Sequence, residues 1–176
     1  MEQIYREPPV WPKVIGGLSL GWGVLGLGCL GCGIGWFVLG PGMLPPAMKD
    51  MPAMNPGPGQ WAQMAVSSLI TILLITAGAM TCMRNPLGRV LHLIYGALSL
   101  PMLFWALIVQ IDVNARTRQW LAEQPNLPPG AGGGGPMGEV IGYVVTAVMG
   151  LAYPVFILVW FGAIKHRKDA MTGTEE

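Results

Sequence analysis

Residues 14–39 read VIGGLSLGWGVLGLGCLGCGIGWFVL, a run of 26 residues without one charged side chain. A helix needs about 20 apolar residues to cross the hydrocarbon core of a bilayer, which is about 30 Å thick. The run is therefore long enough to span a membrane. It is also unusually rich in glycine, which indicates close packing against another helix rather than a freely exposed surface.

Three further stretches have the same character, namely residues 61–83, 88–111 and 139–164. The chain of 176 residues is 52% hydrophobic and only 11% charged, whereas soluble domains carry roughly 25% charged residues. No stretch alternates polar and apolar residues as a lipid-facing barrel strand does. We therefore predict an all-α protein, an integral membrane bundle of four antiparallel transmembrane helices. These helices form one membrane domain, residues 1–176, with outer loops at 40–60 and 112–138.

The links between the spans differ in length and composition. Residues 84–87 form a very short link in which Asn85 is placed to cap the following helix, so the second and third spans should form a tight hairpin. Residues 112–124 are expected to extend the third helix beyond the membrane. The glycine- and proline-rich residues 125–138 are expected to be flexible.

Basic residues near the span ends predict the orientation. Seven of the ten lysines and arginines lie on the side of the N-terminal tail, the 84–87 link and the C-terminal tail. We therefore expect both termini to be cytoplasmic, in a multi-pass protein of a bacterial inner membrane. The first span is expected to be retained, because a signal-peptide core has only about 7–15 residues. The net charge of +1 gives no reason to expect a nucleic-acid partner.

The glycines of the first span fall on two helical faces. Gly21, Gly28 and Gly35 are spaced by seven residues and share one face, and Gly26, Gly33 and Gly40 share a second. Small residues let membrane helices approach closely. We therefore expect this helix to be gripped by neighbours in the lipid bilayer, either in the same chain, in a second copy, or in another membrane protein. The alternative is a flexible or pore-lining helix.

Side chains for chemistry are scarce in the spans. His92 lies about one turn inside the third span, and without visible partners we expect an interfacial histidine that is hydrogen-bonded or faces lipid headgroups. Ser67, Ser68 and Thr71 are expected to form hydrogen bonds between helices, because no base is visible to activate them as nucleophiles. We expect no enzyme activity, no catalytic residue and no cofactor.

One group of residues favours a different function. Methionines at positions 43, 48, 51 and 54 lie in the first outer loop, and thioethers select Cu(I). Cys29 and Cys32 lie in the outer half of the first span, three positions apart and hence on one side of a helix. A copper(I) site of Met43, Met48, Met51, Met54, Cys29 and Cys32 is therefore an alternative hypothesis. Cys82 lies near the opposite membrane surface, too far away to complete it.

Three segments carry a resemblance. The PPVWPKVIG stretch at residues 8–16 precedes the glycine-rich span, GRVLHL at 88–93 opens the third span, and AYPVF at 152–156 lies in the fourth. In these segments the chain resembles small bacterial four-span membrane proteins of uncharacterised function, which implies the four-span fold and no activity. The leading hypothesis is a non-enzymatic helix-packing, assembly or accessory subunit. The alternatives are extracytoplasmic copper handling and a small passive channel.

Overall fold

The computed structural model describes residues 10–45, 48–124 and 135–163. They form four long helices, α1 (Trp11–Met43), α2 (Pro58–Cys82), α3 (Leu87–Ala122) and α4 (Gly135–Leu158). A short 3-10 turn, η2 (Pro52–Met54), precedes α2, and a π-helical turn, η3 (Val159–Ala163), continues α4. The described ranges contain no strand. The all-helical prediction is confirmed.

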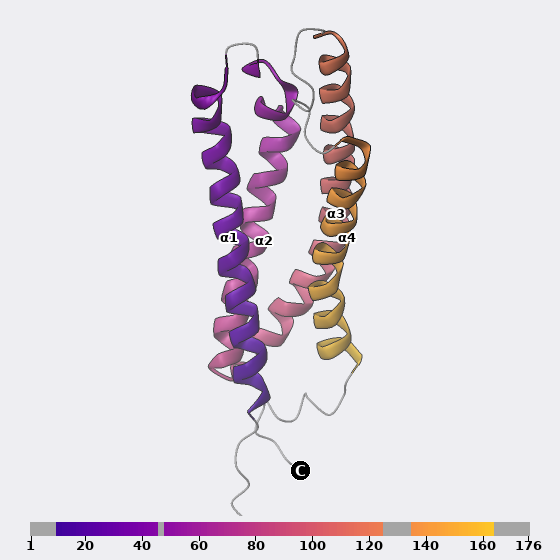
Figure 1. Cartoon of the computed structure of the whole chain (residues 1–176). Helices are drawn as coiled ribbons and strands as arrows, with labels where there is room; N and C mark the ends of the chain where they lie inside the picture. The colour runs from indigo at the N-terminus through magenta and orange to yellow at the C-terminus, as the bar shows by residue number, and fades with distance from the viewer. Residues whose placement is uncertain (1–9, 46–47, 125–134, 164–176) are drawn as a thin grey trace, which may run out of the picture.

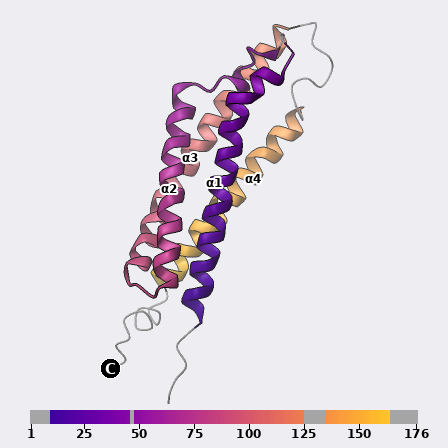
Figure 2. The same ribbon diagram turned by 90° about the vertical axis from the view of Figure 1, so that its left-hand side faces the viewer.

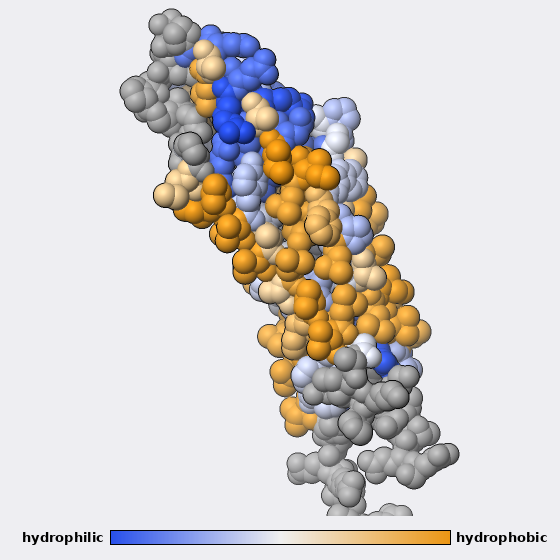
Figure 3. All heavy atoms as spheres, turned by 90° about the vertical axis from the view of Figure 1, so that its right-hand side faces the viewer, coloured by the Kyte–Doolittle hydropathy of each residue, from blue (hydrophilic) through white to orange (hydrophobic). Residues whose placement is uncertain are grey.

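The surfaces of the four helices fit a membrane. Each is long and apolar enough to cross a bilayer, and many large apolar side chains point outward, for example Leu69, Phe104 and Val148 at 67%, 64% and 57% exposure. Figure 3 shows a broad apolar surface, with hydrophilic residues gathered at one end. Exposed apolar surface on this scale is typical of protein that contacts lipid. By length and composition, the four helices therefore indicate a multi-pass membrane protein.

The first three helices are longer than the predicted spans. The first reaches Met43 rather than residue 39, and the third continues to Ala122, so the expected extension through residues 112–122 is present. The predicted outer loop 40–60 contains η2 and the first turn of α2. The expectation that residues 125–138 are flexible is wrong for residues 135–138, which form the first turn of α4. Predictions for residues 125–134 and from residue 164 onward lie outside the described residues.

The turn between α2 and α3 is built as the sequence suggests. Asn85 N–H donates to the carbonyl of Met80 at 2.9 Å, and Arg84 N–H donates to that of Thr81 at 3.0 Å. Arg84 has a φ of 58°, so this is a Schellman ending with a non-glycine residue in the left-handed position. The Asn85 side chain then accepts a hydrogen bond from Leu87 N–H at 3.0 Å. The predicted cap is confirmed, and it fixes the direction in which α3 leaves α2.

Glycines bring three helices together near this turn. A Cβ atom on Gly16 of α1 would lie 2.7 Å from the carbonyl oxygen of Gly78 on α2, and one on Gly78 would lie 2.9 Å from that of Gly16. On α3, a Cβ on Gly88 would lie 2.7 Å from Thr81 N. No side chain fits at these crossings. We call this end of the bundle, where residues 83–86 join α2 to α3, the hairpin end (Figure 1).

Toward the other end, α3 and α4 are joined by polar side chains. Asn114 donates to the Tyr143 hydroxyl at 2.9 Å, and the Thr146 hydroxyl donates to Gln110 at 3.3 Å. Beyond them Arg118 pairs with Glu139 at 3.6 Å. Figure 2 shows the four helices running side by side in the long direction of the bundle. Apolar contact alone gives little driving force in lipid, so such pairs help to align neighbouring helices.

Replacing Gly78 with alanine should destabilise the bundle by about 1–3 kcal/mol, the usual cost of overpacking. The added methyl would lie 2.9 Å from Gly16 O and 3.0 Å from Leu20 N, which are backbone atoms that move only with α1. Thermal unfolding in detergent, followed by circular dichroism, measures the loss. Gly59→Ala in the same helix is the control, because nothing lies within 4 Å of that position. Equal stability of the two variants would contradict this packing.

Candidate functional site

A cluster of four polar side chains lies buried near the hairpin end. Ser19 comes from α1, Thr81 from α2, His92 from α3 and Tyr153 from α4. The exposed fraction of Ser19, Thr81 and His92 is 0% in each case. We call these four residues the His92 cluster. It is the place where all four helices exchange polar contacts.

The imidazole of His92 is held at both ring nitrogens. Its Nδ1 lies 2.7 Å from the carbonyl oxygen of Gly88, one turn earlier in α3, and 3.3 Å from the Thr81 hydroxyl. The Thr81 hydroxyl itself donates to Ala77 O at 2.8 Å. Because a carbonyl only accepts, we assign the proton to Nδ1. The other nitrogen, Nε2, lies 2.7 Å from the Ser19 hydroxyl.

The Ser19 hydroxyl is the centre of the cluster. Besides His92 it contacts the Tyr153 hydroxyl at 2.6 Å and the carbonyl of Ile15 at 2.8 Å. A serine hydroxyl has one proton to donate and two lone pairs to accept with. Ile15 O and the unprotonated Nε2 can only accept, so the single Ser19 proton serves one of them at a time, while the Tyr153 hydroxyl can donate to a lone pair of Ser19. Ser19 ties α1 to both α3 and α4.

Aromatic rings enclose the cluster. Phe161 stacks on the His92 ring, with centroids 4.9 Å apart and planes 28° from parallel, and is only 2% exposed. Trp22 stacks on Tyr153 at 5.7 Å. The guanidinium of Arg89 donates to Phe161 O from Nε at 3.2 Å and from Nη2 at 2.8 Å, which holds the π-helical turn in place. Water has no open route to the imidazole in this arrangement.

The expectation that His92 faces lipid headgroups is wrong, whereas the hydrogen-bonded alternative is confirmed. Sequence reasoning missed the cluster because Ser19, which bonds His92, and Tyr153, which bonds Ser19, are 73 and 61 residues away from His92 along the chain. One signal was present. Ser19, Thr81 and His92 lie two to five residues inside predicted spans that end at the same surface, and polar groups in lipid seek one another.

The Ser19–His92 pair has the spacing of a nucleophile and its base. Neither residue is exposed, and the Phe161 ring covers the imidazole. A substrate atom cannot reach the Ser19 oxygen, which is already bonded to three neighbours. The arrangement therefore fits hydrogen bonding and proton exchange within the bundle better than attack on a bound molecule.

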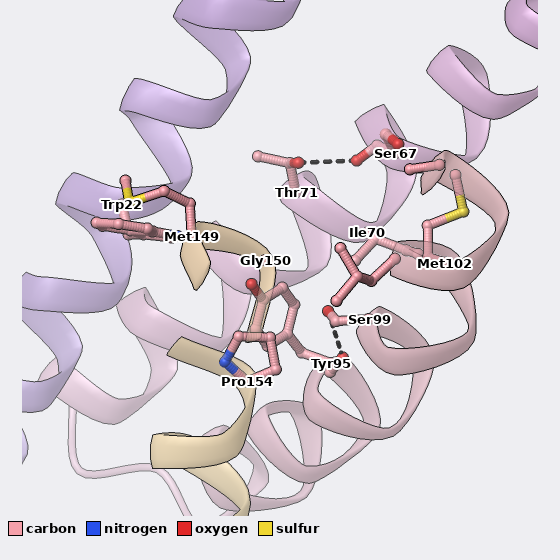
Figure 4. A pocket seen from close by; sticks show the side chains of 12 residues that line it. Trp22, Ser67, Ile70, Thr71, Tyr95, Ser99, Met102, Met149, Gly150 and Pro154 are labelled. Atoms are coloured by element: carbon pink, nitrogen blue, oxygen red, sulfur yellow. Dashed lines mark hydrogen bonds between the residues drawn. The ribbon is translucent and has the colours of Figure 1, made fainter. Parts of the chain in front are cut away.

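A cavity of about 210 Å³ lies beside the cluster, lined by residues of all four helices (Figure 4). Four of its side chains carry hydroxyl groups, Ser67 and Thr71 from α2 and Tyr95 and Ser99 from α3. Thr71 donates to Ser67 O at 2.7 Å and Ser99 to Tyr95 O at 2.7 Å. These bonds stay within one helix, as does that of Ser68 to Met64 O at 2.9 Å. The predicted interhelical bonds of Ser68 and Thr71 are therefore wrong.

The glycines of α1 divide between two environments. Gly16, Gly23 and Gly26 face α2, where added Cβ atoms would meet Cys82, Ile75 and Thr71. By contrast, nothing lies within 4 Å of a Cβ at Gly17, Gly21, Gly28, Gly31 or Gly35. At about 100° per residue these five share one side of the helix, and we call them the outer glycine stripe. The predicted face of Gly21, Gly28 and Gly35 is thus not gripped by a helix of the same chain.

In the second predicted face, of Gly26, Gly33 and Gly40, only the first contacts another helix. A Cβ on Gly26 would lie 3.3 Å from Thr71, whereas one on Gly40 would meet Trp36 of its own helix and one on Gly33 nothing within 4 Å. This face therefore packs against α2 at only one of its three glycines.

The proposed copper ligands lie in two separate places. Met48, Met51 and Met54 follow one another in turns, with Met51 N–H donating to Met48 O at 3.2 Å and Met54 N–H to Met51 O at 2.8 Å. Met51 is 7% exposed and Met43 is 76% exposed. Cys29 and Cys32 are exposed on α1. Eleven helical residues separate Cys32 from Met43, about 16 Å, so one ion cannot bind both. Whether the methionines bind copper stays a prediction.

A comparison of the chain with protein-family models, with curated proteins and with solved structures finds no significant match.

Ser19→Ala should destabilise the bundle by about 1–2 kcal/mol, because His92 Nε2 and the Tyr153 hydroxyl both lose a hydrogen-bond partner at a buried site. Tyr153→Phe removes one of the same bonds. The double variant should therefore lose less stability than the two single losses added together. Unfolding in detergent measures the coupling.

Thr76→Ala serves as the control, since the Thr76 hydroxyl bonds only Ile72 O of its own helix, at 2.9 Å. Strict additivity of the Ser19 and Tyr153 losses would argue against the shared bond.

Proposed function

We propose that the chain is a non-enzymatic assembly subunit of a bacterial inner membrane and that it associates with a second copy of itself through α1. The observation that carries the proposal is the outer glycine stripe, at which added Cβ atoms would meet nothing. In this proposal the four helices are antiparallel, with the hairpin end and both termini on the cytoplasmic side. The register of Gly16 with Cys82, Gly23 with Ile75 and Gly26 with Thr71 supports the antiparallel order of α1 and α2.

The glycines of the outer stripe lower the intrinsic stability of the α1 helix, and this loss needs an explanation. Glycine is about 1 kcal/mol less favourable than alanine inside a helix, and here five of them gain no contact within the described chain. The inner glycines of the same helix, Gly16 and Gly23, show what such positions allow, namely approach to backbone distance. The outer glycine stripe has the same spacing, which supports an equally close approach to α1 by a helix of another molecule.

A second copy is the occupant that fits best. A glycine-lined helix packs tightly only against another helix that also presents small residues. Among the described outward faces, that of α4 carries bulky side chains such as Val140, Val144 and Val148, whereas α1 carries the stripe. Two α1 helices related by a two-fold axis would present the same surface to each other.

Copper handling stays as a second candidate because of one observation. The backbone bonds that link Met48 to Met51 and Met51 to Met54 place three methionines in two consecutive turns. Thioethers are ligands that select Cu(I), which supports this candidate.

Gly21→Leu and Gly28→Leu should each lower the dimerisation constant at least about tenfold, which corresponds to about 1.4 kcal/mol. The bulky side chains would hold the two α1 backbones apart. Sedimentation in detergent and energy transfer between labelled copies in vesicles both measure the constant. Gly138→Leu on α4 is the matched control, because nothing lies within 4 Å of that glycine either. A wild-type chain that stays monomeric in both systems would overturn the proposal.

Cu(I) titration under reducing conditions tests the second candidate. If the methionines form a site, the chain binds about one equivalent, and a variant with Met48, Met51 and Met54 changed to leucine loses it. The control is the double variant Cys29→Ser and Cys32→Ser, which should bind as the wild type does, because the cysteines lie too far from the loop. Equal binding by wild type and the methionine variant would exclude this site.

A further inference from the structure

The hydrogen bonds of the His92 cluster can be satisfied with the imidazole either neutral or protonated. In the neutral form, Nδ1–H donates to Gly88 O at 2.7 Å and Nε2 needs a donor. The Ser19 hydroxyl, 2.7 Å away, supplies it. The Tyr153 hydroxyl then donates to Ser19 Oγ at 2.6 Å. Every proton in this chain of bonds has an acceptor.

If the Ser19 hydroxyl rotates, the same cluster can also satisfy the hydrogen bonds of a protonated His92 ring. A proton added at Nε2 forms a new N–H bond, and this N–H donates to Ser19 Oγ. The Ser19 proton turns to the carbonyl of Ile15, 2.8 Å away, which can accept a further bond. Tyr153 continues to donate to the second lone pair of Ser19. No other bond is made or broken, so the charge changes by one proton only.

The surroundings of His92 contain few charged or titratable groups. The neighbours from α1 and α2 are the neutral side chains of Ser19 and Thr81. Next to Thr81 in sequence, the Cys82 thiol contacts Lys13 O at 3.9 Å. From α4 come the Tyr153 phenol and the Phe161 ring.

On α3 itself, the neighbours are Arg89 and the Tyr95 phenol. Arg89 is the only formal charge among them, and its guanidinium is directed to Phe161 O. The carboxylates of the described residues, Asp50, Asp112, Glu123 and Glu139, lie in the connections or helix turns away from the hairpin end. A protonated ring would therefore be stabilised by Gly88 O, by Ser19 Oγ and by the face of Phe161.

We propose that His92 is a buried proton-binding site and that the Ser19 hydroxyl reports its charge to α1 and α4. The site takes a proton and no larger ligand, because both side chains are 0% exposed. In the neutral form the Ser19 hydroxyl of α1 donates to His92 Nε2 of α3. After protonation, His92 Nε2–H donates to Ser19 Oγ instead, and the Ser19 hydroxyl donates to the Ile15 carbonyl of its own helix. The proposal does not depend on self-association of α1, so either can fail alone.

The proton reaches His92 from the hairpin end. His92 is five residues from the first residue of α3, about 7.5 Å along the helix axis. The Phe161 ring covers one face of the imidazole, and Arg89 holds the carbonyl of the π-helical turn that carries this ring.

Nuclear magnetic resonance of the full-length protein in nanodiscs, labelled with ¹⁵N-histidine and ¹³C-tyrosine, tests the proposal. The His92 signals are assigned by His92→Gln, which separates them from those of His166. We expect the Nδ1–H tautomer at high pH and reversible conversion to the doubly protonated ring as the pH falls, with unchanged circular dichroism. The Tyr153 ¹³Cζ signal should move with the same midpoint. A ring that keeps one protonation state over the whole pH range in which the protein stays folded would overturn the proposal.

The Ser19→Ala variant tests whether Tyr153 responds to the charge of His92 through the Ser19 hydroxyl or only because the two side chains are close. In that variant His92 should still titrate, whereas the pH-dependent movement of the Tyr153 signal should be lost. Thr76→Ala should keep both. If Tyr153 follows His92 equally well without the Ser19 hydroxyl, the proposed role of Ser19 is wrong. Should Ser19→Ala not fold, a ¹³C label on the Ile15 carbonyl of the wild type reports the same rotation, and a carbonyl signal that ignores the His92 titration would refute it.

Discussion

Close backbone approach at the hairpin end is the constraint on which the rest of the bundle depends. Gly16 and Gly78 let α1 and α2 meet at distances at which no side chain fits, and Gly88 does the same for α3 against Thr81. Only at such separations can short side chains such as Ser19 and Thr81 reach His92 directly. A Cβ atom at any of these glycines would lie only 2.7–2.9 Å from backbone atoms of the neighbouring helix, so the helices would have to move apart and the hydrogen bonds of the cluster would lengthen.

The four helices were predictable from sequence because the signal is local. Length, apolar content and lack of charge are properties of each span by itself, and the Asn85 cap is encoded within a few residues. The His92 cluster depends instead on how each of four helices is rotated about its own axis. Hydropathy does not specify that rotation when every face is apolar. Ser19, His92 and Tyr153 were therefore visible as residues but not as partners.

The glycines of α1 illustrate the same limit of prediction from sequence. Their spacing predicts which of them share a face, and the structure keeps Gly21, Gly28 and Gly35 together. Spacing cannot predict which face the chain itself covers. Here Gly16 and Gly23 face α2, because Ser19 between them must point toward His92 and Tyr153. The polar cluster thus orients α1 and leaves the stripe outward.

Buried polar groups rarely raise stability above that of a well-packed apolar core, but they penalise wrong arrangements, in which they have no partner. This distinction matters most in lipid, where apolar helix faces are nearly interchangeable. If α1 rotated by one residue, about 100°, Ser19 would leave His92 Nε2 and the Tyr153 hydroxyl without their partner inside the bundle. Ser19 and Gly21 are about 200° apart on the helix, so the residue that fixes the inner contacts also fixes where the outer glycine stripe points. The inner cluster and the outer surface are therefore two consequences of one helix orientation.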